Sequence, residues 1–118
     1  MKQNVLLDKT FAFSVEIVKL VRKLQIEEKE YVLSRQLLKA ATSIGANAEE
    51  AMAGESQADF LAKLIIAHKE ARETKYWLRL ITASCICDCS TYLNSVEEIL
   101  RIISSIIITT KNNRADSQ

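Results

Sequence analysis

A chain of 118 residues that contains no proline and only two glycines, Gly45 and Gly54, has few positions at which its backbone can turn sharply. Sheet proteins need frequent turns, and glycine and proline are the residues that most often make them. The scarcity therefore favours long helices joined by a few short connections. The length fits one domain spanning residues 1–118, and a hydrophobic fraction of 48% is typical of a globular protein.

Apolar residues recur at intervals of three and four in four segments, at about residues 8–25, 30–53, 57–83 and 91–110. Ser56 can cap the third segment with Asp59 in its first turn, and we expect Gly54, a residue that tolerates left-handed geometry, to end the second. Short links between four helices predict an all-α, antiparallel up-down-up-down bundle. The tail at 111–118 is expected to be frayed or disordered. The third segment has the most regular core pattern, formed by Phe60, Leu64, Ala67, Ala71, Thr74, Leu78 and Ile81.

Small residues gather in the later half of the second segment. Its core stripe begins with Leu33 and Leu37 but ends with Ile44, Ala48 and Ala51. Small side chains let a neighbouring backbone approach closely, so we expect this half to lie at a tight helix crossing.

The first and fourth segments carry more apolar surface than one bundle core needs. In the first, Phe11, Val15 and Val18 form one stripe, and Phe13, Ile17, Leu20 and Leu24 form another on roughly the opposite side. We expect Phe13–Ile17–Leu20 and Ile102–Ile106 to be outer faces that neighbouring copies cover. The sequence thus predicts self-association, with an unusually large single core as the alternative.

The charge and cysteine content restrict the binding partners and the cellular compartment that we expect for this protein. Sixteen Lys and Arg against fifteen Asp and Glu give a net charge of +1, so no global charge favours nucleic acid or membranes. The apolar run Ile99–Thr110 is too short for a membrane span and contains Arg101. We recognise no signal peptide, and three cysteines clustered in CICDC do not form a disulfide framework. A cytoplasmic protein is the simplest expectation.

Residues 34–81 carry a set of specific motifs: Arg35, SIGAN with Ser43 and Asn47, Glu50, ESxxDF with Phe60, and AxKEAxET with Glu70 and Glu73. This segment resembles the four-helix-bundle family of bacterial ribosomal-RNA intervening-sequence proteins, which is related to the accessory variability determinant of diversity-generating retroelements. The resemblance implies a ring-shaped homopentamer, and no enzymatic activity is established for the family. The role of most members is unknown, and RNA binding has been suggested. The chain departs from many members at Ala51, where they carry glycine.

Polar residues flank the two central core stripes at helical spacing. We interpret them as a structural polar seam between helices or subunits, with Arg35 as a counter-charge for the carboxylates. The alternative is a carboxylate metal site, but His68 is the only histidine and lies about 100–200° around the helix from Glu70 and Glu73. We therefore expect no metal, cofactor or catalytic residue. The seam comprises Arg35, Ser43, Asn47, Glu50, Glu70 and Glu73.

His68, Arg72, Lys75 and Arg79 form a row at spacings of four, three and four, with Tyr76 beside it. The row can meet phosphates or an acidic partner, and its alternative is an ordinary solvated helix face. The leading hypothesis is a non-enzymatic oligomeric scaffold that binds another macromolecule. The alternative is an RNA-binding protein linked to ribosomal RNA intervening sequences.

Overall fold

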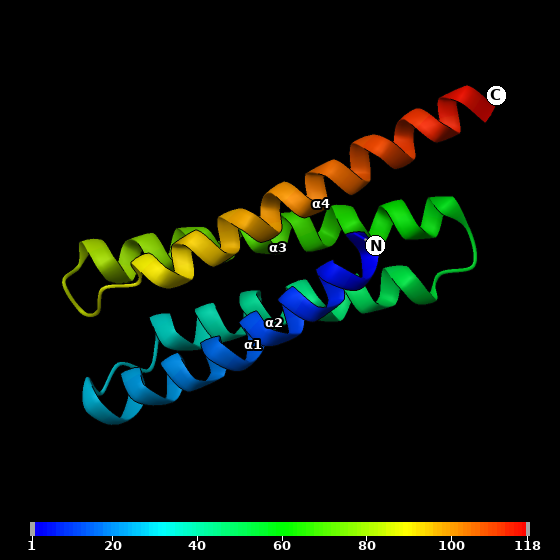
Figure 1. Ribbon diagram of the computed structural model, residues 1–118. Coiled ribbons are helices and arrows are strands. Elements are labelled where there is room, and N and C mark those ends of the chain that lie inside the picture. Colours follow the sequence, from blue (N-terminus) through cyan, green and yellow to red (C-terminus); the bar gives the residue numbers. More distant parts are fainter. Residues whose placement is uncertain (1, 118) are drawn as a thin grey trace.

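The computed structural model describes the backbone of residues 2–117 and the side chains of residues 5–114. Over the described backbone the chain forms four helices and no strand: α1 (Lys2–Glu27), α2 (Leu33–Ala53), α3 (Gln57–Ala83) and α4 (Ser90–Ser117). α1 and α3 each pack on both α2 and α4, whereas the described backbones of α1 and α3, and of α2 and α4, face each other diagonally across the core. The helices therefore stand at the four corners of an elongated bundle of 54 × 22 × 22 Å (Figure 1). The predicted all-α four-helix fold is confirmed.

The predicted helix bounds are confirmed for α3 and only approximate for the others. The Ser56 hydroxyl accepts a hydrogen bond from the Asp59 N–H at 3.1 Å, which is the predicted cap of α3. α1 begins at Lys2 instead of Asp8, and α2 begins at Leu33 instead of Glu30. Gly54 ends α2 as predicted, but it does so with an extended backbone, at a φ of −64° and a ψ of 147°, and makes no use of its tolerance for the left-handed conformation.

α4 continues to Ser117, beyond its predicted end at about Thr110, and Gln118 lies outside the described residues. Thr110 and Asn113 line a hollow with the α2–α3 connection and Phe60, so this part of α4 lies against the bundle. Arg114 in the last turn also favours the helix, because a cation stabilises the negative end of the helix dipole. In the described part of the chain, no helix combines the length and apolar character needed to cross a membrane.

Glu30 determines where α2 begins. Its carboxylate accepts hydrogen bonds from the N–H groups of Val32, Leu33 and Ser34 at 3.2, 3.1 and 2.7 Å. These are N–H groups of the first turn, which have no partner inside the helix. Glu30 was predicted to lie at the start of the helix itself, whereas it lies in the connection before α2 and caps the helix with its side chain.

The tight crossing predicted for the second segment is present between α1 and α2. Gly45 is buried, and a Cβ at that position would lie 3.5 Å from the Cβ, carbonyl oxygen and Oγ1 of Thr10. Thr10 is itself buried, and its hydroxyl donates to the Leu6 carbonyl oxygen at 2.8 Å. The small residues of α2 thus let the α1 backbone approach closely.

The two stripes of α1 are assigned the other way round from the prediction. Phe13, Ile17 and Leu20 are buried in the core, whereas Phe11, Val15 and Val18 are exposed. The reason is continuity: the buried stripe extends at the same spacing through Leu6, Thr10 and Leu24, while the exposed one is bounded by Asp8 and Arg22. On α4, Ile106 is buried and Ile102 is half-buried, so that predicted outer face is wrong too, and Ile108 is the exposed residue.

Candidate partner-binding surfaces

Of the four residues in the basic row on α3, two contact α4 and two are exposed to solvent. His68 Nε2 lies 3.0 Å from the Ser104 Oγ, and Lys75 Nζ lies 3.4 Å from the Glu97 Oε1, so both side chains face α4. Arg72 and Arg79 are exposed. Of the predicted row, only these two therefore offer an uncommitted positive charge to a partner.

His68 is held in its uncharged form at neutral pH. Burial beside α4, together with the positive charge of Arg72, lowers the pKa of His68 below its ordinary value. Its ring can then exchange a hydrogen bond with the Ser104 hydroxyl without bringing another cation to the surface. Among the four residues of the row, the positive charges without an ion pair are therefore those of Arg72 and Arg79.

An open hollow of about 230 Å³ lies beside the row, between α3 and α4. Its floor is apolar, and Arg72 stands at one side. A second, shallower depression continues along α4 past Arg101. We call the first of these the α3/α4 hollow; it is lined by Ile65, His68, Arg72, Ser104, Ile107 and Ile108. Apolar walls between two arginines suit an apolar side chain that has carboxylates beside it.

The exposed stripe of α1, formed by Phe11, Val15 and Val18, is the second apolar surface, and we call it the α1 stripe. Phe11 leaves 66% of its surface exposed to solvent. Single exposed apolar residues are ordinary, but a row of three with an aromatic ring at its end is typical of a contact surface.

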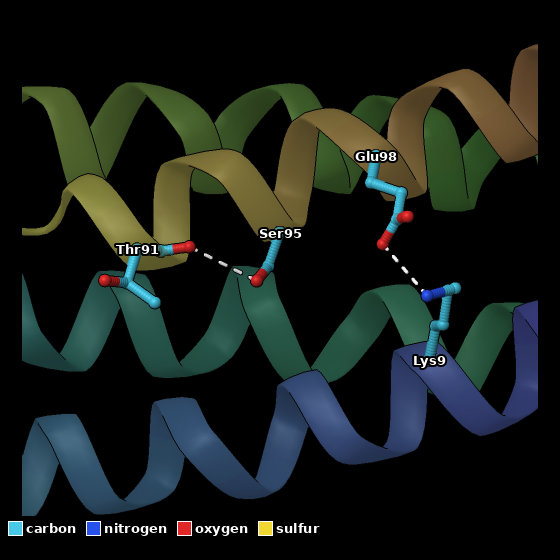
Figure 2. A network of polar contacts seen from close by, with 4 residues as sticks. All are labelled: Lys9, Thr91, Ser95 and Glu98. Atoms are coloured by element: carbon cyan, nitrogen blue, oxygen red, sulfur yellow. Dashed lines mark hydrogen bonds and ion pairs between the residues drawn. The ribbon is translucent and has the colours of Figure 1, made fainter.

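A groove of about 480 Å³ separates α1 from α4. Figure 2 shows the ion pair that crosses it, in which Lys9 Nζ lies 3.0 Å from Glu98 Oε1, and the Ser95 hydroxyl that donates to the Thr91 carbonyl oxygen at 3.2 Å. Tyr92 also lines the groove, where burial and the nearby Glu16 carboxylate raise its pKa. Both signs of charge line the walls, so the groove selects for neither an anion nor a cation.

The predicted polar seam lies at the edges of α2 and α3, but its hydrogen bonds stay within each helix or reach the residues just before it. Ser43 Oγ donates to the Lys39 carbonyl oxygen at 2.8 Å, and Asn47 Nδ2 donates to the Ser43 carbonyl oxygen at 2.9 Å. Arg35 Nε donates to the Tyr31 carbonyl oxygen at 3.0 Å. Among the described side chains Arg35 therefore meets no seam carboxylate, and its predicted role as counter-charge is not fulfilled inside one subunit.

The seam glutamates also lack a shared partner within the chain. Trp77 Nε1 donates to Glu73 Oε2 at 3.1 Å, along α3 itself. Glu70 is half-buried, and Glu50 is exposed. Over the side chains at 5–114, no three His, Cys, Asp or Glu residues group as metal ligands would. An intersubunit seam remains a prediction.

The cysteine link after α3 presents its thiols in three environments. Cys85 is exposed, Cys87 is half-buried at the α1/α4 groove and Cys89 is buried. Burial raises the pKa of Cys89 to about 11, which keeps this thiol protonated and unreactive at neutral pH. The link thus combines an accessible thiol with a structural one.

The sequence of this bundle matches the model of a known protein family, described as 23S rRNA-intervening sequence protein, over residues 2–108. The chain belongs to this family. The fold agrees with a crystal structure from Bacteroides thetaiotaomicron, described as a protein with unknown function from the S23 ribosomal protein family. The two chains are 46% identical and superpose with a TM-score of 0.88, over 91% of this chain and 98% of the other. No curated protein matches.

Family membership bears out the resemblance inferred from residues 34–81 and extends it across all four helices. It links the chain to the 23S rRNA intervening sequence by the family's description, while the similar crystal structure has no assigned function. Sequence reasoning missed Ile65, Ser104 and the capping role of Glu30. Ile65 lies outside the core stripe of α3. An apolar residue outside that stripe, next to Ile66, was the signal in the sequence that could have identified it.

Proposed function

We propose that this intervening-sequence protein is a non-enzymatic scaffold that assembles from several copies of itself and binds another macromolecule. The observation that carries the proposal is the surplus of exposed apolar surface on a bundle whose core is already filled. The α1 stripe and the Ile65–Ile108 edge lie outside the packed interior. Covering them against other copies removes apolar area from water, which favours association.

The proposed assembly is a ring of five antiparallel bundles. The antiparallel order is supported by the contacts between α3 and α4, because His68 meets Ser104 whereas the later residue Lys75 meets the earlier residue Glu97. The number five follows from the family resemblance. We place the protein in the cytoplasm, as its odd number of clustered cysteines favours.

Light scattering coupled to size-exclusion chromatography tests the assembly. We expect a mass near five times the 13.3 kDa subunit at micromolar concentration. A monomer of 13.3 kDa over the whole accessible concentration range would overturn the scaffold proposal. A stable oligomer of another size would keep the scaffold and correct the number.

The second candidate is RNA binding, and the exposed Arg72, Tyr76 and Arg79 favour it. Arginine pairs with phosphate, and an aromatic ring offers a stacking surface for an unpaired base. In a mobility-shift assay with structured ribosomal RNA, binding should weaken steeply with salt and weaken further in the Arg72→Glu/Arg79→Glu variant. The matched control is Lys39→Glu/Lys111→Glu, which makes the same charge change at two exposed residues of α2 and α4. Equal losses in both variants, or no shift at low salt, would contradict this function.

A further inference from the structure

We propose that the α1 stripe of one copy docks into the α3/α4 hollow of the next copy, with Phe11 as the inserted side chain. The inference rests on the self-association proposed above and adds its interface. The occupant is a second copy of this chain, and it is supported by the position of the two surfaces, by their equal height on the bundle and by their opposite charge.

The two surfaces lie on opposite sides of the bundle. Lys9 turns toward α4 and Thr10 toward α2, as their contacts with Glu98 and Gly45 show. Phe11 is one residue further on, and each helical residue adds 100° of rotation, so its side chain points outward past α2. The hollow is formed by the other two helices, α3 and α4. Figure 1 shows the pair α1 and α2 on one side and the pair α3 and α4 on the other.

Opposite surfaces produce a head-to-tail contact. Each copy then offers the α1 stripe to one neighbour and the hollow to the other, which gives a closed ring when the rotation between copies closes. A self-complementary pair would instead need one surface to meet its own counterpart. An interface between these two opposite surfaces is therefore of the kind that a ring requires.

The stripe and the hollow lie at the same height along the bundle. Phe11 adjoins Thr10, which packs against Gly45. Gly45 comes nine residues before Gly54, where α2 ends, and Ile65 comes nine residues after Ser56, which caps α3. Since every helical residue rises 1.5 Å, Gly45 and Ile65 stand level. Copies related by rotation about an axis along the bundle can thus bring Phe11 to the hollow without sliding.

The charges beside the two surfaces are complementary. Asp8, three residues before Phe11 on α1, and Glu49, one turn after Gly45 on α2, are both exposed. Arg72 lines the hollow, and Arg101 stands in the neighbouring depression. Carboxylates flanking an apolar side chain therefore meet arginines flanking an apolar floor, which orients the contact and opposes its reversal.

At the end of the bundle away from Phe11, the charges oppose contact between neighbouring copies. There both faces carry exposed arginines, Arg22 and Arg35 on one and Arg79 on the other. Like charges repel, so the interface is confined to the end that holds Phe11 and Ile65. This confinement also favours the hollow as a seat for one aromatic ring over an extended helix-to-helix contact.

Two variants and their mixture test the interface by light scattering. Phe11→Asp and Ile65→Asp should each fall from the wild-type mass to the 13.3 kDa subunit, because each loses one of the two surfaces. An equimolar mixture should recover a dimer of twice that mass, since the intact stripe of the Ile65→Asp variant still fits the intact hollow of the Phe11→Asp variant. The control is Ile26→Asp, whose 67% exposure matches the 66% of Phe11, and it should keep the wild-type mass. Circular dichroism should show unchanged helix content and so confirm that the variants fold.

The outcomes separate this interface from the proposed function. A monomeric wild type would overturn the self-association on which both depend. A wild-type oligomer that survives Phe11→Asp would overturn the interface and leave the scaffold proposal intact. If Phe11→Asp fell to the mass of the monomer while Ile65→Asp kept the wild-type oligomer mass, the contact would be a self-complementary one between α1 stripes. That result would overturn the head-to-tail arrangement. An intact oligomer in which Ile65→Asp abolishes only RNA binding would assign the hollow to RNA.

Discussion

Replacing Gly45 by alanine should stabilise the protein, although the glycine packs against Thr10 where α2 meets α1. An added Cβ would lie 3.5 Å from Thr10 Cβ, carbonyl oxygen and Oγ1, which are ordinary van der Waals distances. Gly45 has no positive φ, so alanine fits its backbone. Glycine inside a helix costs about 0.5–1 kcal/mol relative to alanine, because it loses more backbone freedom on folding. We therefore expect Gly45→Ala to raise the free energy of unfolding by ~0.5–1 kcal/mol.

Urea unfolding followed by circular dichroism measures this change, at one protein concentration because association makes stability depend on concentration. Gly54→Ala is the control: its Cβ would lie 3.2 Å from the Ala51 carbonyl oxygen and 3.3 Å from the Asp59 Cβ, outside the helix interior. It should give no gain. Gly45→Leu should destabilise by about 1–3 kcal/mol through overpacking. If Gly45→Ala unfolded more easily than the wild type, the crossing would be tighter than these distances allow and the reasoning would fail.

Two further predictions concern the ends of the connections. Glu30→Ala should lower the free energy of unfolding by about 1 kcal/mol at pH 7, as loss of a helix cap does. Partial burial raises the pKa of Glu30, but hydrogen bonds from the backbone of Ser34, Leu33 and Val32 outweigh it and place the pKa below the ordinary 4.5. This stabilisation is present above the unfolded-state pKa and is lost as the pH falls through the folded-state pKa. The free energies of unfolding of the wild type and of Glu30→Ala should therefore converge in acid. The control, Glu28→Ala, should change the free energy of unfolding little at any pH. At neutral pH a thiol reagent should modify the exposed Cys85 rapidly and the buried Cys89 only on unfolding; Cys89→Ser should remove the slow phase, and equal rates for the two thiols would contradict their placement.

The sequence predicted a helix well where its apolar spacing allowed only one buried face, and less well where it allowed two. The bounds of α3 follow from the sequence because Ser56 caps its start and the core pattern runs unbroken to Ile81. The two stripes of α1 were harder, because helical spacing identifies a face without saying which neighbour covers it. The polar residues that bound the exposed stripe, Asp8 and Arg22, held that information. The continuity of a stripe along the whole helix is the better guide to burial.

The candidate site was less predictable, because it depends on contacts between helices. Spacing placed Ser43 and Asn47 at the edge of a core, yet such side chains can bond to carbonyl oxygens of their own helix, and these do. The row on α3 was found, but nothing in its spacing separated His68, which meets α4, from Arg72, which remains free. Only the position of α4 divides the row.

A neighbouring copy and an RNA would use part of the same surface, the α3/α4 hollow with Arg72. Filling the hollow therefore changes which cations are left for RNA. Arg72 lines the hollow that we assign to Phe11 of a neighbour, whereas Arg79 lies two turns further along α3, beyond that contact. In a ring whose hollows are all filled, Arg72 would be covered and the cations left for phosphate would be those at the other end, Arg22, Arg35 and Arg79. Those ends would all lie on one side of the ring, so their charges would add around it. A nearly neutral subunit can therefore present a basic surface once it is assembled, and the +1 charge of the single chain does not measure the affinity of the ring for nucleic acid.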